Sequence, residues 1–246
     1  MITRTIEERI NIALAKKKAV TIMGPRQVGK STLAYSIIPK DAKVLEINGD
    51  NTDVQTMFVN VDEAKMKILI GNNNFLFVDE AQKIENVGNM LKIVAEKFKD
   101  VKIIVTGSSA FKLAEAVNES LTGRKREFKL YPLSFKEMAD DTSVLEESRM
   151  IDHRLIYGYY PEVVTSPGDE KEVLKELIDS YLYKDVMEEN NIAKPDKLVK
   201  LVQALAFQIG STVSATELAG LVGIDAKTVE RYIEILERSY IIFTLP

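Results

Sequence analysis

The chain has 246 residues, of which 46% are hydrophobic and 28% are charged, and its formal net charge at pH 7 is −4. This composition is typical of a globular protein in water, and no apolar run approaches the roughly 20 residues that a membrane-spanning helix needs. Because there is no cysteine and a single histidine, His153, the composition excludes disulfides, a catalytic thiol and clustered zinc ligands, and a cytoplasmic location is expected.

The first half of the chain alternates two kinds of pattern. Residues 1–18 mix charged and apolar residues at helical spacing, which predicts an amphipathic helix rather than a secretory signal. From there to Phe135, short β-branched runs alternate with longer helical patterns, as in a parallel sheet with crossover helices. The expected strands are 19–23, 43–47, 74–78, 101–106 and 128–130, and the expected helices are 31–38, 61–71 and 86–98.

Long helical patterns replace the strands in the second half of the chain. They cover residues 134–138, 143–157, 169–190 and 196–209. Ser214 then opens a capping-box pattern with Glu217. Two helices, 215–222 and 226–238, flank a short turn, as in a helix-turn-helix. The apolar run 240–245 is expected to form the first strand of a wing, and we interpret a lone strand at this place as the mark of a shortened chain.

A glycine-rich loop joins the first expected strand to the helix that follows it. Its residues, Gly24-Pro25-Arg26-Gln27-Val28-Gly29-Lys30-Ser31, match the pattern of Gly, four residues, Gly, Lys, and Ser or Thr. Backbone N–H groups and the helix dipole would bind phosphate there. Lys30 would reach the β- and γ-phosphates, Ser31 is a hydroxyl ligand suited to Mg²⁺, and Thr32 can bond the α-phosphate. The alternative is a chance match in a strand-to-helix turn.

Two carboxylates end the buried run at residues 75–78. We expect Asp79 to hold Mg²⁺ through water and Glu80 to act as the general base that polarises the attacking water. The alternative is that the acidic pair caps the following helix. The occurrence of this pair downstream of the loop favours the catalytic interpretation.

Further polar side chains could complete the site. Ser108, in Thr106-Gly107-Ser108-Ser109, follows the next strand and would sense the γ-phosphate or position the water, although an ordinary helix cap before Ala110 is the competing interpretation. Arg124 offers a bidentate cation for transition-state charge, in its own site or in a neighbour's, and a structural salt bridge is equally favoured. Arg126 competes with Arg124 for this role. For Arg26, within the glycine-rich loop, the alternative to a contact with phosphate is projection to solvent.

Taken in order, these motifs resemble the prokaryotic AAA-type ATPases of the AAA and STAND assemblage, over nearly all of the chain. The residues that carry the resemblance are Gly24-Pro25-Arg26-Gln27-Val28-Gly29-Lys30-Ser31, Phe77-Val78-Asp79-Glu80-Ala81-Gln82, Thr106-Gly107-Ser108-Ser109, Leu121-Thr122-Gly123-Arg124 and Tyr131-Pro132-Leu133-Ser134-Phe135.

The resemblance implies a three-part α/β protein. It predicts a P-loop NTPase core at 1–133, a helical lid at 134–194 and a winged-helix-like domain at 195–246. The core would be a parallel sheet with covering helices, and an added strand would lie between the loop strand and the Asp79 strand. Relatives place a Gly-x-Pro segment of the lid against adenine, and here Tyr159-Tyr160-Pro161 holds that place, with Pro161 as the contact. Members usually carry a nuclease-like domain, which would begin after Leu245.

Three functions remain open at this point. The first is a Mg²⁺-dependent ATPase that acts as a conformational switch or motor, with a protein partner or a second copy of itself. The second is a DNA-associated or protein-docking module that uses nucleotide mainly as a structural ligand. Its helix-turn-helix segment, 211–246, has three basic and five acidic side chains, which disfavours binding to a phosphate backbone. The third is a small-molecule kinase, which Glu80 and Ser108 disfavour.

Overall fold

The computed structural model describes residues 2–108, 120–187 and 192–245, without the side chains of 182–185. Contacts divide the chain into two compact units, Met1–Gly168 and Asp169–Pro246. The finer division predicted at residues 133 and 194 stays a prediction. Among the helices of the described residues, none has the length and apolar character that crossing a membrane requires.

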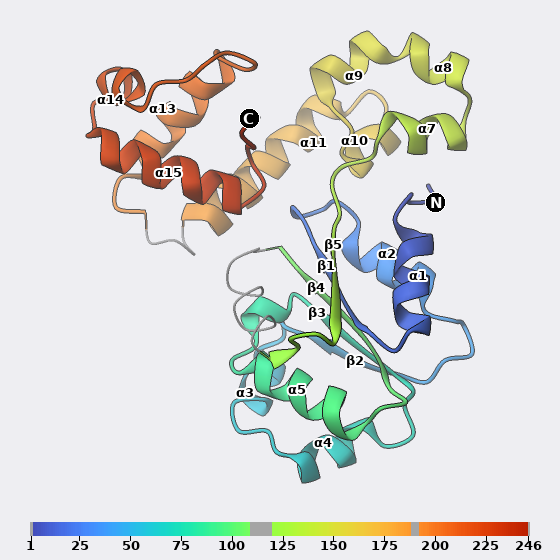
Figure 1. The fold of residues 1–246 in the computed structure, drawn as a ribbon. Coiled ribbons are helices and arrows are strands. Elements are labelled where there is room, and N and C mark those ends of the chain that lie inside the picture. The colour runs from blue at the N-terminus through green and yellow to red at the C-terminus, as the bar shows by residue number, and fades with distance from the viewer. Residues whose placement is uncertain (1, 109–119, 188–191, 246) are drawn as a thin grey trace. The chain divides into compact units, whose positions relative to one another are not determined.

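The first unit is built on a five-stranded parallel sheet with the order β2-β3-β4-β1-β5 (Figure 1). The predicted α/β fold is therefore confirmed, including the added strand, because β4 lies between β1 and β3. The strands are β1 (Ala19–Met23), β2 (Val44–Asn48), β3 (Phe75–Asp79), β4 (Lys102–Gly107) and β5 (Lys125–Lys129). β1 and most of β3 are buried, as expected for strands that are covered on both faces.

Helices cover the sheet and continue beyond it. Apolar side chains of α1 and α2 join a buried cluster with Val20, Ile22 and Phe77, so these two helices pack on the same face of the sheet. The helices of the first unit are α1 (Glu7–Ala15), α2 (Lys30–Ile37), α3 (Thr52–Met57), α4 (Glu63–Ile70), the 3-10 turn η1 (Ala81–Lys83), α5 (Val87–Lys97), α7 (Phe135–Asp141), α8 (Val144–Arg149), α9 (Ile151–Tyr157) and α10 (Pro161–Thr165).

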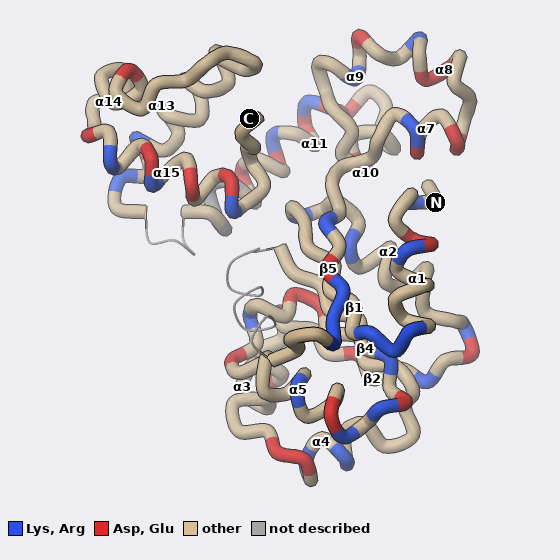
Figure 2. The backbone as a smooth tube through the Cα atoms, viewed as in Figure 1, with Lys and Arg blue, Asp and Glu red and all other residues tan. Residues whose placement is uncertain are grey.

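β5 and α3 are two of the elements in this unit that differ from the sequence prediction. β5 begins at Lys125, three residues before the predicted start, because its first residues are charged and lack an apolar signal. Charge is tolerated there because β5 is an edge strand, and Figure 2 shows the basic segment along it. α3 was not predicted, and none of its side chains is buried, so no apolar periodicity could reveal it.

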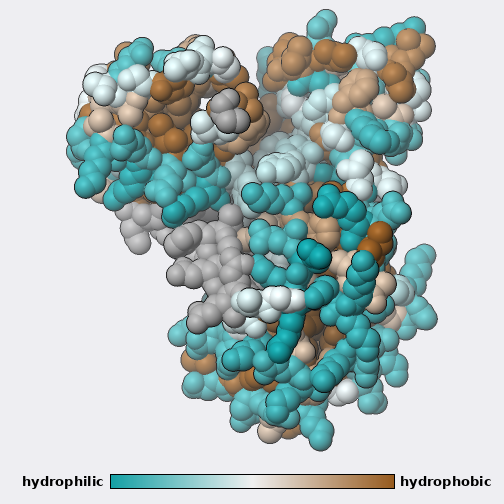
Figure 3. Space-filling model, viewed as in Figure 1, coloured by the Kyte–Doolittle hydropathy of each residue, from teal (hydrophilic) through white to brown (hydrophobic). Residues whose placement is uncertain are grey.

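The predicted helix 143–157 is in fact two helices, α8 and α9, which meet at Met150. Both expose apolar side chains, and Figure 3 shows brown patches over these helices. The exposed apolar residues of the two helices are Val144, Leu145, Ile151, Leu155 and Ile156.

The second unit is helical in its described residues. Its elements are α11 (Glu170–Leu177), the π-helix η2 (Ile178–Val186), α13 (Pro195–Ala206), α14 (Ala215–Val222) and α15 (Ala226–Arg238). Leu198, Leu218 and Tyr232 belong to one buried cluster, so α13, α14 and α15 share a core. The predicted helix-turn-helix pair is present as α14 and α15, and Gly223 ends α14 in the left-handed conformation.

Two details of the second unit correct the sequence prediction. Ser214 makes no side-chain hydrogen bond at the start of α14, so the predicted capping box does not form. The expected strand at 240–245 is also wrong, because these residues form turn and irregular structure. Ile241 and Ile242 are apolar because they pack against the helical core, which gives a run that resembles a strand in the sequence.

Gly49 follows β2 and packs closely against the end of β3. Its N–H donates to the Asp79 carbonyl at 2.9 Å, and an added Cβ would lie 2.3 Å from the Glu80 carbonyl oxygen. Gly49→Ala is therefore expected to lower the free energy of unfolding by about 1–3 kcal/mol, because the clash forces a backbone shift. Denaturant unfolding measures this loss. The matched control is Gly220→Ala in α14, where an added Cβ meets nothing within 4 Å and destabilisation is not expected. Equal losses in both variants would contradict the packing argument.

Candidate functional site

The carboxyl ends of β1, β3 and β4 meet at one edge of the sheet. Met23 at the end of β1 pairs in register with Gly107 at the end of β4, and β3 is the next neighbour of β4. The segments that follow these strands are the glycine-rich loop, Asp79-Glu80 and Ser108. The parallel sheet thus brings three distant segments together, at the edge where α/β proteins place their ligand sites.

The glycine-rich loop is held in a compact curl. Gly24 lies so close to Leu130, the residue after β5, that an added Cβ would be 2.0 Å from the Leu130 carbonyl oxygen. Gln27 and Gly29 both have positive φ, at 57° and 91°, and Val28 between them is fully buried. α2 begins at Lys30, one residue before the predicted start, with Gly29 as its N-cap. The first N–H groups of α2 therefore open onto the loop, which is the backbone arrangement that binds anions.

Lys30 is buried beside the loop carbonyls. Its Nζ donates to the carbonyl oxygens of Gly24 at 3.1 Å and Pro25 at 2.8 Å, and it lies 3.9 Å from Glu80 Oε1. Burial lowers the pKa of Lys30 below the ordinary lysine value, although Glu80 and Asp79 act in the opposite direction. The loop thus holds a desolvated cation that can exchange its carbonyl partners for phosphate oxygens.

The lowered pKa of Lys30 predicts a pH dependence of nucleotide affinity. Phosphate binding uses the ammonium form, so affinity for ATP is expected to fall as pH rises through a pKa below the ordinary value of 10.5. Binding titrations between about pH 7 and pH 10 measure the effect. Lys30→Arg keeps its charge over this range and serves as the control, with a flat profile. A flat profile in the unsubstituted protein would contradict the prediction.

Ser31 and Asp79 form the oxygen pair of the site. Ser31 Oγ lies 3.0 Å from Asp79 Oδ1 and 2.9 Å from Asp79 Oδ2, and the Thr106 hydroxyl also donates to Asp79. A hydroxyl and a carboxylate at this spacing fit Mg²⁺, which takes hard oxygen ligands and keeps several waters. Within the described residues no group of three or more His, Cys, Asp or Glu side chains is placed to hold a metal ion.

Glu80 is oriented by two polar neighbours. It has a φ of 47°, in the left-handed region, at the residue that directly follows β3. Ser108 Oγ donates to Glu80 Oε2 at 2.9 Å, while Gln82 Nε2 donates both to Glu80 Oε2 and to Ser108 Oγ, the latter at 2.9 Å. One carboxylate oxygen is thus held by two donors, and the other faces Lys30. This arrangement fixes the direction of a candidate general base.

Gln82 and Arg4 are the side chains near the site that sequence reasoning missed. Gln82 is only two residues from Glu80, so its place beside the carboxylate could have been considered. Arg4 gave no signal, because it lies outside every motif and reaches the loop only through the fold. Its Nη1 donates to the Val28 carbonyl at 3.0 Å.

A cavity of about 540 Å³ adjoins the loop and α2. Gly29, Thr32 and Leu33 line it from the loop side, and Arg154 and Pro161 line it from the later helices of the same unit. The structure therefore brings Pro161, at the first position of α10, to the same cavity as the loop. Thr32 is exposed, and the lining combines charged and polar side chains with apolar ones such as Leu133 and Met138.

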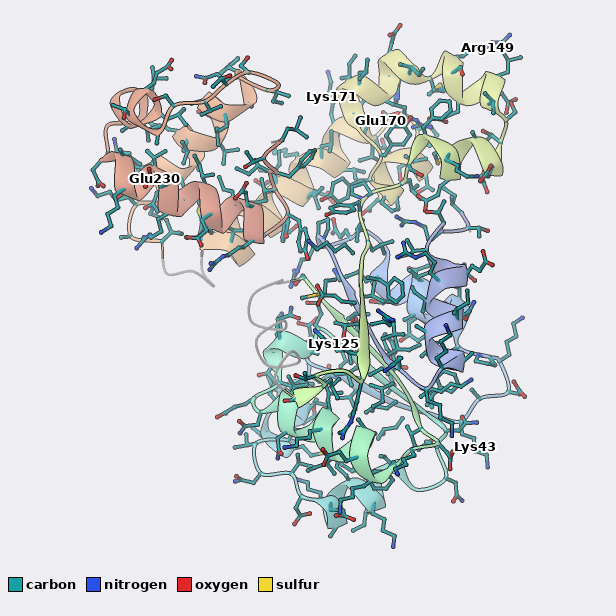
Figure 4. All side chains as sticks on the ribbon, viewed as in Figure 1. Lys43, Lys125, Arg149, Glu170, Lys171 and Glu230 are labelled. Atoms are coloured by element: carbon teal, nitrogen blue, oxygen red, sulfur yellow. The ribbon has the colours of Figure 1, made fainter. Side chains whose placement is uncertain are left out.

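Arg124 is placed away from this site. It precedes β5, whose first residue, labelled in Figure 4, pairs with Ala19 at the amino end of β1. The loop follows the opposite end of β1. Arg124 Nη1 instead lies 2.8 Å from Glu96 Oε1, so the structure favours a salt bridge over action at the site of its own chain. Action in a neighbouring copy stays a prediction.

The remaining candidates differ in exposure. Pro25 is buried, Arg26 is partly exposed and Gln27 is exposed, while Arg126 lies on the exposed part of β5. Ser109 and Ala110, which bear on the helix-cap alternative for Ser108, lie outside the described residues.

A glycine-rich loop, a Ser–Asp oxygen pair and a parallel sheet of this order define a P-loop NTPase fold. The family comparison is more specific: the chain belongs to the AAA domain family, which matches residues 16–139. A domain of unknown function matches residues 134–246.

The chain is similar to two uncharacterized proteins in sequence and to one solved ATPase in fold. An uncharacterized protein of Methanocaldococcus jannaschii is 26% identical over 98% of this chain and 59% of its own length, and an uncharacterized protein of Haemophilus influenzae is 27% identical over 69% and 44%. The chain thus spans about half the length of the curated relatives it matches. The solved Walker-type ATPase of Pyrococcus abyssi is similar with a TM-score of 0.61 at 15% identity, covering 97% of this chain and 90% of that one.

Proposed function

We propose that the chain binds ATP together with Mg²⁺ at residues 24–32 and hydrolyses the γ-phosphate. The observation that carries the proposal is the convergence of Lys30, the Ser31–Asp79 pair and Glu80 at one edge of the sheet. Each group alone has other uses, but together they supply a phosphate cradle, a metal site and a base.

The residues around Glu80 have distinct roles in this proposal. Water attacks the γ-phosphorus, the bond to the bridging oxygen of ADP breaks, and the proton of the water passes to Glu80. Ser108 and Gln82 hold Glu80 Oε2, so Oε1 is the oxygen left to accept the proton. Lys30 stabilises the phosphate charge from the loop side. Bound Mg²⁺ would neutralise the phosphate oxygens, and Ser31 and Asp79 are the residues that would hold it.

The cavity beside the loop is the proposed site of the nucleoside. Pro161 lines it together with Gly29 and Thr32, which supports an apolar contact of Pro161 with the base. Segments 134–194 and 195–246 would then act as a helical lid and a winged-helix-like domain, and hydrolysis would switch their conformation. A protein partner or a second copy of the chain would respond to that change of conformation.

Calorimetric titration with ATP and with ADP, each with Mg²⁺, tests nucleotide binding directly. We expect saturable heats for both nucleotides, with weaker ATP binding when Mg²⁺ is removed by a chelator, because Ser31 and Asp79 would lose the ion that links them to the phosphates. Folded protein that gives no heat with either nucleotide would reject the proposal.

Gln82→Leu is expected to lower kcat by about 10–100-fold and to leave KM nearly unchanged, because misplacing a base affects the transition state more than substrate binding. The substitution removes both amide donors that hold Glu80 and Ser108. Steady-state phosphate release measures the two constants. Gln203→Leu, at an exposed position of α13, is the matched control. A rise in KM at constant kcat would assign Gln82 to nucleotide binding instead.

A further inference from the structure

Arg4 is a buried cation whose contacts reach three separate segments. Its Nε lies 3.2 Å from Glu137 Oε1, and its Nη1 donates to the Val28 carbonyl in the loop at 3.0 Å. Its Nη2 donates to the carbonyls of Tyr131 and Pro132, just before α7. One planar guanidinium therefore joins the phosphate loop to the segment that connects β5 with α7.

Glu137 anchors the other end of this network. Its Oε2 accepts the Ser134 N–H at 2.9 Å, which completes a capping box at the start of α7. Its Oε1 accepts the Thr5 N–H at 2.8 Å as well as the bond from Arg4. Although burial raises the pKa of Glu137, the N–H groups of Thr5 and Ser134 and the charge of Arg4 outweigh it and lower that pKa below its usual value.

The geometry makes these contacts depend on one another. Arg4 and Glu137 are both at least nine-tenths buried, and breaking such a pair leaves an uncompensated charge. A rigid guanidinium cannot follow the Val28 carbonyl without moving its other bonds, whereas a lysine ammonium could satisfy only part of the set. An added Cβ at Gly29 would lie 3.8 Å from Arg4 Nη1, so Arg4 reaches the end of the loop beside the start of α2.

We propose that Arg4 is a positioning residue that couples the conformation of the phosphate loop to the segment 131–137 at the start of α7. When the loop binds phosphate, the Val28 carbonyl shifts, and the guanidinium transmits the shift to the carbonyls of Tyr131 and Pro132 and to Glu137. The start of α7 is thereby ordered in response to nucleotide. This inference rests on the proposed nucleotide binding, and it adds the route by which binding is transmitted within the first unit.

Hydrogen exchange of the amides in residues 133–141, with and without ADP and Mg²⁺, tests the coupling. In the unsubstituted protein, nucleotide is expected to slow exchange there by about fivefold or more, the lower end of typical coupling between sites. Arg4→Lys keeps the charge and is expected to bind ADP in calorimetry without this change in exchange. Arg9→Lys, at an exposed position of α1, is the control and should respond like the unsubstituted protein.

A second variant covers the case in which Arg4→Lys does not fold. Arg4→Met with Glu137→Gln removes both buried charges and keeps a residue type that can form a capping box with Ser134. It is also expected to bind ADP without slower exchange at α7. If nucleotide still slows exchange at α7 in either folded variant, the inference is overturned. If neither variant folds, Arg4 is a purely structural residue, and the inference is overturned as well. If the unsubstituted protein binds no nucleotide, the proposed function fails instead.

Discussion

Glu80→Gln is expected to leave ATP binding intact and to lower the rate of hydrolysis by about 10²–10⁴-fold. The amide cannot accept the proton of the attacking water, yet it keeps the size of the side chain and can still bond to Ser108. Calorimetry with ATP and Mg²⁺ measures binding, and phosphate release measures turnover. Because binding and turnover are measured separately, this variant distinguishes a catalytic base from a residue that only shapes the pocket.

The matched control for this prediction is Glu85→Gln, an exposed glutamate five residues further along the chain. It removes the same charge without touching the site and should leave both measurements unchanged. Turnover close to normal in Glu80→Gln would contradict the assignment of the base. Binding lost together with turnover would show that the carboxylate is needed to shape the loop, through its place 3.9 Å from Lys30.

Lys30→Ala is expected to weaken ATP binding and to lower turnover by about 10²–10³-fold, the loss typical of removing one preorganised donor to transition-state charge. The loss should be larger at limiting ATP than at saturation, since Lys30 serves both binding and chemistry. The substitution also leaves the carbonyls of Gly24 and Pro25 without their donor, so the melting temperature has to be measured alongside.

Lys40→Ala is the control for Lys30→Ala. Lys40 is exposed and lies three residues beyond the end of α2, so its loss should change neither affinity nor turnover. If Lys30→Ala keeps normal affinity and turnover while it remains folded, the loop does not bind phosphate in the proposed way. A binding loss that disappears when stability is restored by a different substitution would point to folding instead of chemistry.

Local signals explain why much of the fold could be predicted from the sequence. β1, β3 and most of β4 are buried apolar runs, and their carboxyl ends coincide with the loop, Asp79 and Ser108. The parallel order of such strands necessarily gathers their ends at one edge. The convergence of Lys30, Ser31 and Asp79 could be inferred for this reason before any distance was known.

The other features of the fold and of the site depend on long-range contacts that no local sequence pattern encodes. β5 begins with charged residues because it lies at the edge of the sheet, so its hydrophobic pattern starts late. Arg4 and Glu137 are 133 residues apart in the chain, and only the folded unit shows that they pair. The sequence made Arg124 a candidate for catalysis. The register of β5 instead places it beside the amino end of β1, whereas the loop follows the carboxyl end of β1.

Release of inorganic phosphate from ATP by the purified chain, with Mg²⁺ and without any added acceptor, tests the central claim most directly. We predict steady release that stops when Mg²⁺ is chelated and that is nearly absent in Glu80→Gln protein which still binds ATP. Folded protein that binds ATP but releases no phosphate, or release that is unchanged by Glu80→Gln, would contradict the proposal that this site hydrolyses ATP.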